Sequence, residues 1–296
     1  MKHKMNLYKD PFQMIKNGEK TIELRLYDEK RRKIKVGDLI EFSLTDNPSK
    51  TLLTHVIKLH IFSSFEELYK ELPLLKCGYT KQDIDTASPK DMNLYYSDSE
   101  QQKYGVVGIE VKKVQILETE RLILRPWDEN DAKECYKYAK DPRVGPIAGW
   151  PEHKSVEDSL LAIRNFLTVA ETYAIVLKET GLPIGSISLH HNDLATKDDE
   201  EELGFWLGVP YWGLGIIPEA GRELLRHAFE DLKLNRVWCG YYDGNDKSKR
   251  VQEKLGFKYQ WTNNSVPAPQ MNEVRIGHVN MMTKEDWDNI NKISKK

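Results

Sequence analysis

The first 115 residues alternate apolar and polar positions in short runs. In Thr21–Leu26 every second residue is aliphatic, which predicts a strand with one apolar and one polar face. Leu39–Ser43, which follows the turn Val36–Asp38, and Tyr104–Val111 are predicted to be further strands. Because these strands are short and helix signals between them are few, the pattern favours a small β-barrel.

Two helices are predicted in the same region. The first is capped by Asp10, has Pro11 in its first turn and ends at Gly18. The second begins with a capping box formed by Ser64 and Glu67. The second helix is expected to run to about Leu72.

The remaining residues favour longer elements. Leu203–Val209 is predicted to be an apolar strand, and an amphipathic helix is predicted to begin near Pro218. A second strand follows at Arg236–Tyr241, and a short helix runs from Asn245 to Gly256. Strands and helices mixed in this way predict a second domain of different architecture.

Composition narrows the class of protein. With 296 residues, 40% hydrophobic and 30% charged, the chain can form two globular domains. It has no run of 18 apolar residues, and its first residues lack the apolar core of a signal peptide. Cys77, Cys135 and Cys239 are too few and too scattered for a disulfide framework or a cysteine-based zinc site. We therefore expect a cytoplasmic protein that binds neither a membrane nor a metal.

Charge is divided unevenly along the chain. Residues 1–115 carry 20 Lys and Arg against 17 Asp and Glu, whereas residues 116–296 carry 24 against 29. The connection at residues 111–117 contains no Gly, Pro or Ser, which argues against a flexible linker. We expect two abutting domains, residues 1–115 and residues 116–296.

The segment Tyr211–Ala220 carries the strongest chemical signal. Gly213 and Gly215 lie two residues apart between a strand and a helix, where glycine permits a tight turn. The N–H groups of such a turn and of the first helical turn lack main-chain partners, and the helix dipole favours negative charge beside them. Pro218 fits the first helical position, because its missing N–H would have no helical partner. The loop is predicted to bind a phosphate or pyrophosphate.

Two common phosphate-binding motifs are excluded. A nucleoside-triphosphatase loop needs Lys and then Ser or Thr after its last glycine, and neither follows Gly215. A dinucleotide loop needs a small residue where this chain has Pro218, within a unit of parallel strands that the sequence does not indicate.

Four segments together resemble the GNAT superfamily of N-acetyltransferases, most closely its ribosomal-protein and α-amino acetylating branch. They are, in order, Glu118–Trp127, Gly204–Leu207, Tyr211–Ala220 and Asn245–Phe257. The resemblance covers residues 116–283 and implies a mixed, mostly antiparallel twisted sheet flanked by helices. It also implies acetyl-coenzyme A as co-substrate and a primary amine as acceptor.

By this resemblance, the loop donates main-chain N–H groups to the coenzyme pyrophosphate. Pro218 replaces the usual Thr or Ser and removes one donor, and Pro210 removes a common side-chain contact. Asn245 matches the residue that bonds the pantetheine arm, although Asn is also an ordinary helix cap. The residues implied to contact the coenzyme are Leu207, Val209, Trp212, Gly213, Leu214, Gly215, Ile216, Ile217, Asn245, Ser248 and Arg250.

The resemblance implies direct attack of a neutral amine on the thioester, with a main-chain N–H of residues 204–209 stabilising the oxyanion. Many members use a Tyr to protonate the leaving thiolate, and here that position is Gln252. Ser248 is therefore the candidate acid, the alternative being a hydroxyl that only supports the helix end. Glu202 is the candidate base acting through water, the alternative being that it belongs to a solvated loop end, as acidic runs such as 198–202 usually do.

The absence of a strong base favours an acceptor of low pKa. At pH 7, deprotonating an α-amine of pKa about 8 costs about 1.4 kcal/mol, against about 4.6 kcal/mol for a lysine-like amine of pKa about 10.4. A protein or peptide N-terminus is therefore favoured over antibiotics, polyamines and amino acids. A non-catalytic protein that senses acetyl-coenzyme A and binds RNA is a further alternative.

Gly18–Arg25 resembles the G-x-K-x-x-E-x-R signature of ASCH domains, which have a PUA-like β-barrel, and the resemblance covers residues 3–112. It implies a cleft for RNA or a nucleoside, lined by Lys20, Glu23 and Arg25. The basic run at 30–35 would add phosphate contacts or form a solvated turn. Some relatives hydrolyse acetylated cytidine with a Thr where this chain has Glu23, so binding is predicted rather than hydrolysis.

Overall fold

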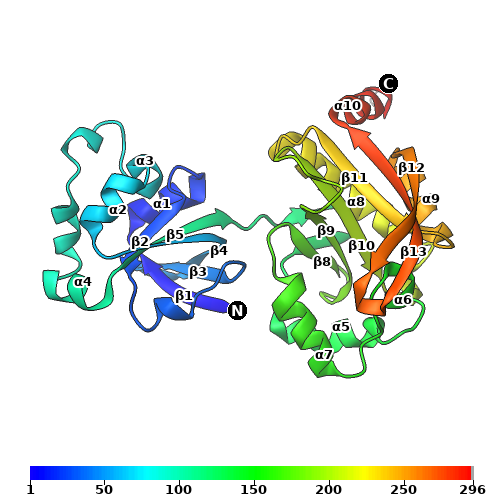
Figure 1. Ribbon diagram of the computed structural model, residues 1–296, viewed down its shortest axis with the longest axis horizontal. Coiled ribbons are helices and arrows are strands. Elements are labelled where there is room, and N and C mark those ends of the chain that lie inside the picture. The colour runs from blue at the N-terminus through cyan, green and yellow to red at the C-terminus, as the bar shows by residue number, and fades with distance from the viewer. Residues whose placement is uncertain (295–296) are drawn as a thin grey trace. The chain divides into compact units, whose positions relative to one another are not determined.

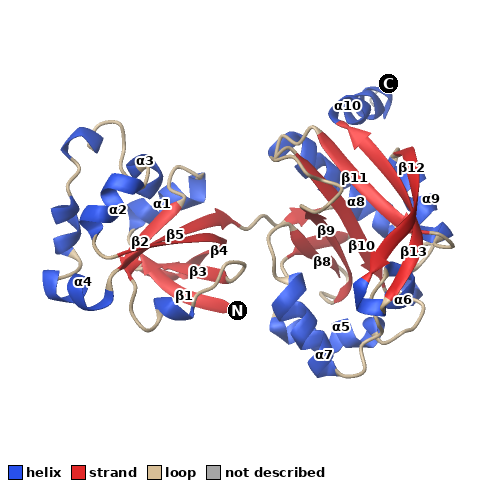
Figure 2. Cartoon of the chain, viewed as in Figure 1, coloured by secondary structure: helices blue, strands red, loops and turns tan. Residues whose placement is uncertain are grey.

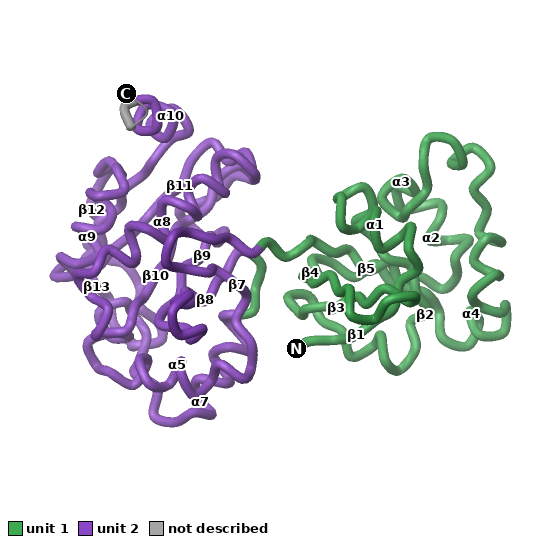
Figure 3. The backbone as a smooth tube through the Cα atoms, turned by 180° about the vertical axis from the view of Figure 1, so that it is seen from behind, with its two compact units in different colours: residues 1–115, 168–170 green, residues 116–167, 171–296 purple. Residues whose placement is uncertain are grey.

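The computed structural model describes residues 1–294, which fold into two compact units (Figure 3). Unit 1 comprises residues 1–115 with 168–170, and unit 2 comprises residues 116–167 with the residues from 171 onward. Each unit has its own sheet and its own hydrophobic core.

Unit 1 is built on a five-stranded sheet curled into a half-barrel (Figure 1). In spatial order its strands are β1 (Lys2–Leu7), β3 (Leu39–Leu44), β4 (Asn47–Phe62), β5 (Val106–Lys113) and β2 (Ile22–Leu26). β1 pairs with β3 in parallel, and the other neighbours are antiparallel. Its α-helices are α1 (Lys9–Asn17), α2 (Phe65–Glu71), α3 (Leu74–Cys77) and α4 (Asp98–Tyr104).

Both helices predicted for unit 1 are present, with small corrections at their ends. α1 begins one residue before Asp10, which therefore lies in the first turn, where its charge suits the helix dipole, and does not cap the helix. Gly18 ends α1 with a φ of 82°, as predicted. Ser64 caps α2 by accepting from the N–H of Glu67, but the Glu67 carboxylate accepts from the N–H of Ser63 rather than Ser64.

The alternation of apolar and polar residues predicts the short strands of unit 1 but not the longest strand, β4. Ile22, Leu24 and Leu26 of β2 are buried together against α2, as their alternation predicts. The strand β4 was not predicted, because its residues 47–51 are polar and exposed and its sequence does not alternate. The opposite face of β2 is not solvated at Glu23, because this residue is only 4% exposed.

Unit 2 contains an eight-stranded sheet with helices on both faces (Figure 2). In spatial order its strands are β12 (Lys258–Ala268), β13 (Glu273–Thr283), β11 (Arg236–Tyr242), β10 (Glu200–Leu207), β9 (Pro183–His190), β8 (Thr172–Leu177), β7 (Leu122–Arg125) and β6 (Leu117–Glu118). β10 and β11 pair in parallel, and the other neighbours are antiparallel. Its α-helices are α5 (Ala132–Ala139), α6 (Gly145–Ala148), α7 (Val156–Ala162), α8 (Ile216–Arg226), α9 (Asp246–Leu255) and α10 (Lys284–Ser294).

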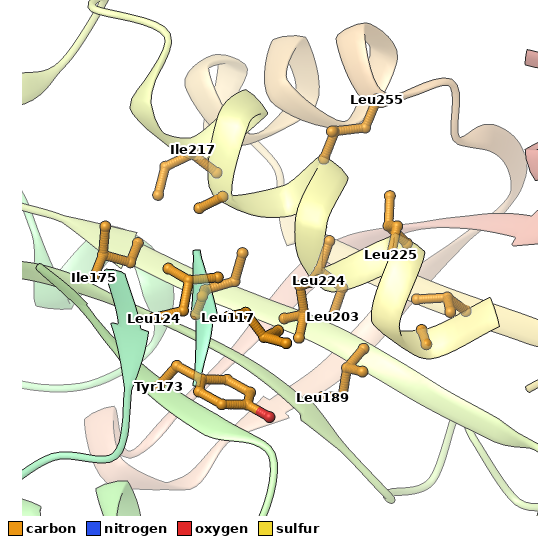
Figure 4. Close-up of a cluster of buried hydrophobic side chains, with 14 of the residues drawn as sticks. Leu117, Leu124, Tyr173, Ile175, Leu189, Leu203, Ile217, Leu224, Leu225 and Leu255 are labelled. Atoms are coloured by element: carbon orange, nitrogen blue, oxygen red, sulfur yellow. The ribbon is translucent and has the colours of Figure 1, made fainter. Parts of the chain in front are cut away.

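At β8, both faces of the unit 2 sheet are buried. On β8, Tyr173 and Ile175 lie in a core with Leu224 of α8 (Figure 4). The intervening residue Ala174 packs with Cys135 of α5 on the other face. Only the first residue of β8, Thr172, is polar, and a strand that is apolar on both faces is the pattern expected between two layers of helices.

Three predicted boundaries in unit 2 need correction. β10 begins at Glu200 and ends before Val209, which lies in a short turn of 3₁₀-helix (Val209–Tyr211). α8 begins at Ile216, so Pro218 is its third residue and not its first. Pro218 still costs the helix no hydrogen bond, because the N–H of a third helical residue also lacks a helical partner.

Candidate active site

A cleft opens in unit 2 where two parallel strands diverge. β10 and β11 pair only over Glu200–Glu202 and Arg236–Trp238, although β10 continues to Leu207 and β11 to Tyr242. The cavity here has a volume of about 1100 Å³. It is lined by the end of β10, the loop before α8, the first turns of α8 and α9, and the segment 142–148.

Side chains replace the main-chain pairing that is missing at the divergence. Gly240 of β11 donates its N–H to Glu202 Oε1 at 3.1 Å, and its carbonyl accepts from Gln252 Nε2 at 3.2 Å. The Cys239 thiol donates to the carbonyl of Leu203 at 3.2 Å. Since an unpaired buried polar group costs about 1–3 kcal/mol, these bonds stabilise the separated strands.

The loop before α8 presents a row of main-chain donors. Gly213 and Gly215 have φ angles of 77° and 75°, the left-handed conformation that glycine adopts without strain. No main-chain hydrogen bond among residues 1–294 uses the N–H groups of Gly213, Leu214 or Gly215. Those of Ile216 and Ile217 lie in the first turn of α8, which offers no partner. Five successive donors thus stand at the positive end of a helix dipole, the arrangement that binds phosphate groups.

Residues just before β7 anchor this loop. Arg121 Nη1 donates to the Leu214 carbonyl at 3.1 Å, and Arg121 Nη2 lies 2.6 Å from Glu219 Oε2 in α8. Thr119 also donates to Glu219, at 2.5 Å. Burial raises the pKa of Glu219, but these hydrogen bonds outweigh burial and hold the pKa below its usual value. The opening motif of the acetyltransferase resemblance therefore has a physical role, which is to fix the loop on α8.

The start of α9 forms the facing part of the cavity lining. Asn245 Oδ1 accepts from the N–H of Ser248 at 3.2 Å, so Asn245 is a helix cap, and it also lines the cavity. The half-buried hydroxyl of Ser248 accepts from Gln252 Nε2 at 3.1 Å. The Lys247 ammonium lies 4.6 Å from the centre of the Trp212 ring, a cation–π contact that joins α9 to the loop before α8.

Most of the residues expected to contact the coenzyme lie around this one cavity. Those that line it are Leu207, Trp212, Gly213, Gly215, Ile216, Ile217, Asn245, Ser248 and Arg250. Val209 and Leu214 are not among the lining residues: Val209 lies in the turn after β10, and the carbonyl of the exposed Leu214 faces Arg121.

Glu202 lies where the strands part and does not line the cavity. Its Oε2 is 3.6 Å from His190 Nε2 and accepts a hydrogen bond from Asn192. Burial raises the pKa of Glu202, but its interactions with His190, Asn192 and Gly240 outweigh burial and hold the pKa below its usual value. Because such a carboxylate is a weak base, the geometry favours a role in holding the strands apart over proton removal.

One wall of the cavity has no counterpart in the sequence expectations. The segment 142–148 brings Pro146 and Ile147 to the cavity, and Arg275 of β13 donates to the Pro146 carbonyl at 2.6 Å. The Arg275 guanidinium also lies 5.1 Å from the centre of the Tyr242 ring. Since Pro146 and Arg275 are 129 positions apart, no local pattern could have identified this wall.

In unit 1 the three signature residues form a buried ion cluster. Lys20 Nζ lies 3.2 Å from Glu23 Oε2, and Arg25 Nη2 lies 2.9 Å from Glu23 Oε1. Burial lowers the pKa of Arg25, but Glu23 and Tyr96 outweigh burial and raise it. Lys20 and Glu23 are buried, so Arg25 is the member of the cluster that reaches an open cavity.

That second cavity, of about 480 Å³, is strongly basic. Its lining residues are His3, Lys4, Met5, Asn6, Arg25, Lys30, Arg31, Lys33 and Ile34, with no carboxylate among them. Arg31 pairs with Asp28 outside the lining, at 2.9 Å. No ion pair within residues 1–294 engages Lys30 or Lys33, so both charges are available to a ligand. Of the basic run, Arg32 and Lys35 do not line the cavity.

Neither a metal site nor a membrane-spanning helix is found in the part of the chain that the structure describes. No group of three or more His, Cys, Asp or Glu there is placed to hold a metal ion. No helix formed by residues 1–294 is long and apolar enough to cross a membrane.

Comparison with known families and proteins matches the two parts of the chain to two different kinds of domain. Residues 5–115 match the ASCH domain, and residues 121–258 match the acetyltransferase (GNAT) domain. YdaF of Bacillus subtilis, named as a candidate ribosomal N-acetyltransferase, is 44% identical over 73 residues, which are 25% of this chain and 39% of YdaF. YoaA, an uncharacterized N-acetyltransferase of the same species, is 28% identical over 48% of this chain and 82% of YoaA.

Solved structures agree on the fold. The crystal structure of a GNAT-family acetyltransferase from Bacillus anthracis superposes with a TM-score of 0.52 and 22% sequence identity. The match covers 58% of this chain and 99% of that one. At this identity, the likeness establishes the architecture of unit 2 and nothing finer.

Proposed function

Because the chain carries an ASCH domain followed by a GNAT acetyltransferase domain, we propose that it transfers the acetyl group of acetyl-coenzyme A to a primary amine, preferably the α-amine of a protein or peptide. The observation that carries the proposal is the row of five outward N–H groups at residues 213–217, beside a cavity large enough for a coenzyme. We also propose that the domains extend over residues 1–115 and 116–296.

The coenzyme is proposed to lie between the loop and α9. The N–H groups of residues 213–217 bind the pyrophosphate, and Leu207 and Asn245 contact the pantetheine arm. Lys247 and Arg250 at the start of α9 are exposed cations beside this path and suit the ribose phosphate. Lys247 would then exchange part of its interaction with the Trp212 ring for a phosphate oxygen.

The chemistry proposed is attack of a neutral amine on the thioester carbon. The thioester lies along the edge of β10 that β11 has left, where unpaired N–H groups stabilise the oxyanion. Ser248 is the proposed proton donor to the departing sulfur, because it lines the cavity and carries a hydroxyl. The alternative that Glu202 acts as the base is tested with Glu202→Gln. If the role of Glu202 is structural, this variant should leave the pH dependence of kcat/KM unchanged.

The lining of the cavity supports an acceptor with a single positive charge. Beyond the coenzyme residues it contains Pro146, Ile147 and Trp206, together with the cations Arg143 and Arg275. The lining carboxylates are Asp243 and Asp246, and Asp243 is already 3.0 Å from His278 Nε2. Polyamines and aminoglycosides carry several charges and need more carboxylates than this, so an α-amine at the end of a peptide fits better.

An acceptor panel tests the proposal. Release of free thiol from acetyl-coenzyme A is measured with peptides that differ in their first residue, with the same peptides blocked at the N-terminus, and with spermidine, an aminoglycoside and lysine. Faster release with free N-terminal peptides, abolished by blocking, supports the α-amine. Faster release with spermidine or the aminoglycoside would replace it by a small-molecule acceptor, and binding without release on any amine would indicate a sensor of acetyl-coenzyme A.

For unit 1 we propose binding of RNA or a nucleoside. Arg25 links the buried cluster of Lys20 and Glu23 to the basic cavity, where Lys30 and Lys33 carry unpaired charge. Single-stranded RNA is the expected ligand, because a polyanion gains from several cations at once. The test is a titration with labelled single-stranded RNA, with a nucleoside and with a nucleotide of the same base. If the nucleoside, which has no phosphate, binds as tightly as the nucleotide, the cations of the basic cavity do not contribute to binding. The binding surface would then be the cluster of Lys20, Glu23 and Arg25.

A further inference from the structure

We propose that Gln252 is a positioning residue for the proton-transfer step, acting through Ser248; the inference rests on the acetyl transfer proposed above. Gln252 occupies the position where many GNAT members carry a tyrosine, and an amide cannot itself protonate a thiolate. Its side chain is fully buried, with 0% exposure, and every polar atom of it is hydrogen-bonded. A buried amide with all its bonds made has one orientation, and that orientation carries the argument.

The orientation follows from the partners. The Gly240 carbonyl lies 3.2 Å from the amide of Gln252, and a carbonyl can only accept, so the atom facing it is the nitrogen. The other end of the amide, Oε1, accepts from Asn280 Nδ2 at 2.7 Å. The second hydrogen of the nitrogen is therefore directed to Ser248 Oγ, 3.1 Å away.

This bond decides where the hydroxyl hydrogen of Ser248 points. Since Ser248 Oγ accepts from Gln252, its own O–H must point elsewhere, and the hydroxyl lies at the cavity wall. The divergence of β10 and β11 leaves the Gly240 carbonyl without a partner on β10, which allows it to hold Gln252. The same separation that creates the cleft therefore orients the proposed acid.

Atoms and charge balance in the proposed step. The nitrogen lone pair forms the C–N bond, the C–S bond breaks, and the sulfur leaves with the bonding electron pair. Ser248 gives its proton to the sulfur, and its oxygen regains a proton from the nitrogen, directly or through water. The products are the amide and free coenzyme A, and Gln252 neither gains nor loses a proton.

A double-mutant cycle tests the assignment, with Ser248→Ala, Gln252→Met and the combined variant assayed on the peptide acceptor. We expect Ser248→Ala to lower kcat by about 100-fold, the loss of one general acid. Gln252→Met should lower kcat by about 3–10-fold, the rate equivalent of one neutral hydrogen bond, with the KM for acetyl-coenzyme A unchanged. In the Ser248→Ala background, Gln252→Met should have no further effect on kcat.

The cycle separates positioning from structure. A purely structural role for Gln252 would lower kcat by the same factor with and without the Ser248 hydroxyl, and that result would overturn the inference. If Gln252→Met does not fold, Gln252→Glu replaces it: once ionised, its carboxylate can accept from Ser248 but cannot donate, so kcat at high pH should fall at least as far as expected for Met. Wild-type kcat in Gln252→Glu at high pH would also overturn the inference. Absence of thiol release from the wild-type protein on every amine is a different failure, that of the proposed function itself.

Discussion

The two cavities of this chain differ in the groups proposed to bind their ligands. In unit 2 the proposed pyrophosphate donors are uncharged N–H groups whose directions are fixed by the backbone of residues 213–217, and charged side chains such as Arg143, Arg250 and Arg275 line other parts of the cavity. In unit 1 the groups proposed to bind the ligand are the charged ends of flexible side chains, above all those of Lys30 and Lys33. Fixed donors select a ligand by its geometry, whereas mobile charges attract a polyanion in proportion to its charge. The difference predicts one precise ligand for unit 2 and a class of ligands for unit 1.

The two regions also differ in what holds them in place. The unit 2 loop is attached to α8 and to Arg121 through main-chain and side-chain bonds, so its donors are organised before a ligand arrives. In unit 1 the organised part is the buried cluster of Lys20 and Glu23, and the exposed cations lie beyond it. Salt should therefore weaken ligand binding in unit 1 far more than in unit 2.

The largest expected effect comes from Gly213→Val combined with Gly215→Val. A β-branched residue near φ +75° costs about 1–2 kcal/mol, so the loop should change conformation and its N–H groups should no longer converge. Losing two charge-assisted hydrogen bonds of about 1.5 kcal/mol each corresponds to about a 100-fold loss of acetyl-coenzyme A affinity by calorimetry.

Gly181→Val is the matched control for that variant. Gly181 has a φ of 69°, and a Cβ there would meet no atom within 4 Å, but it does not line the cavity. It should carry a similar strain and leave coenzyme affinity unchanged. Wild-type affinity in the double valine variant would remove the loop from the binding site.

The next largest effect is expected in unit 1, from Lys30→Glu combined with Lys33→Glu. Affinity for single-stranded RNA should fall by about tenfold or more at low salt, and the slope of log affinity against log salt should become shallower by about 0.7 for each phosphate that no longer has a lysine beside it. The KM for acetyl-coenzyme A should not change. Lys9→Glu with Lys16→Glu makes the same charge change on exposed positions of α1 away from the cavity, and an equal loss in that control would contradict a specific basic site.

A smaller effect is expected when the loop of unit 2 loses its anchor. Glu219→Gln removes the charge that pairs with Arg121, whose side chain is 45% exposed, so solvent screening limits the loss. The KM for acetyl-coenzyme A should rise by about 3–10-fold, with kcat nearly unchanged. Glu223→Gln breaks a comparable ion pair, with Arg226, one turn further along α8. If both variants raise KM equally, the anchor has no particular importance.

The smallest expected effect is on the pH dependence of stability, which should differ between the two units. Burial lowers the pKa of His227 in unit 2, but its bonds to Glu171 and Asp231, at 3.1 and 2.8 Å, outweigh burial and raise the pKa. The protonated histidine therefore stabilises unit 2 fully below its unfolded pKa of about 6.5, and this contribution is lost as pH rises through the folded pKa. In thermal scans His227→Gln should melt about 2–4 °C below wild type near pH 5.5, with the gap closing at high pH.

Unit 1 should show the opposite dependence. Burial raises the pKa of Asp38, but hydrogen bonds from the N-terminal ammonium and His3 outweigh burial and lower it. Its contribution is present above its unfolded pKa of about 3.9 and is lost as pH falls through the folded pKa. For unit 2, a difference in melting temperature between His227→Gln and wild type that grows at high pH would contradict a stabilising role for protonated His227.

The sequence was most informative where the determinants are local. Gly213, Gly215 and the helix after them are within a few residues of one another, so the donor loop could be predicted from them alone. The same is true of Asn245, whose side chain caps its own helix. The strand alternation at Ile22–Leu26 was also sufficient to find β2.

What the sequence could not predict depends on interactions between distant segments. The orientation of Gln252 depends on Gly240 and Asn280, which are 12 and 28 positions away. The sequence offered Glu202 as a base acting through water or as part of a solvated acidic run, whereas the structure pairs its carboxylate with the N–H of Gly240 on the neighbouring strand. The curled sheet of unit 1 depends on β4, whose polar residues give no periodic signal.

Whether the loop before α8 binds the coenzyme is tested most sharply by titrating ¹⁵N-labelled protein with acetyl-coenzyme A and following the main-chain amide resonances. We expect the largest shifts at residues 213–217, with the amide resonances of residues 1–115 unmoved. Saturable binding that leaves the amides of Gly213 and Gly215 in place while others shift would contradict this role of the loop.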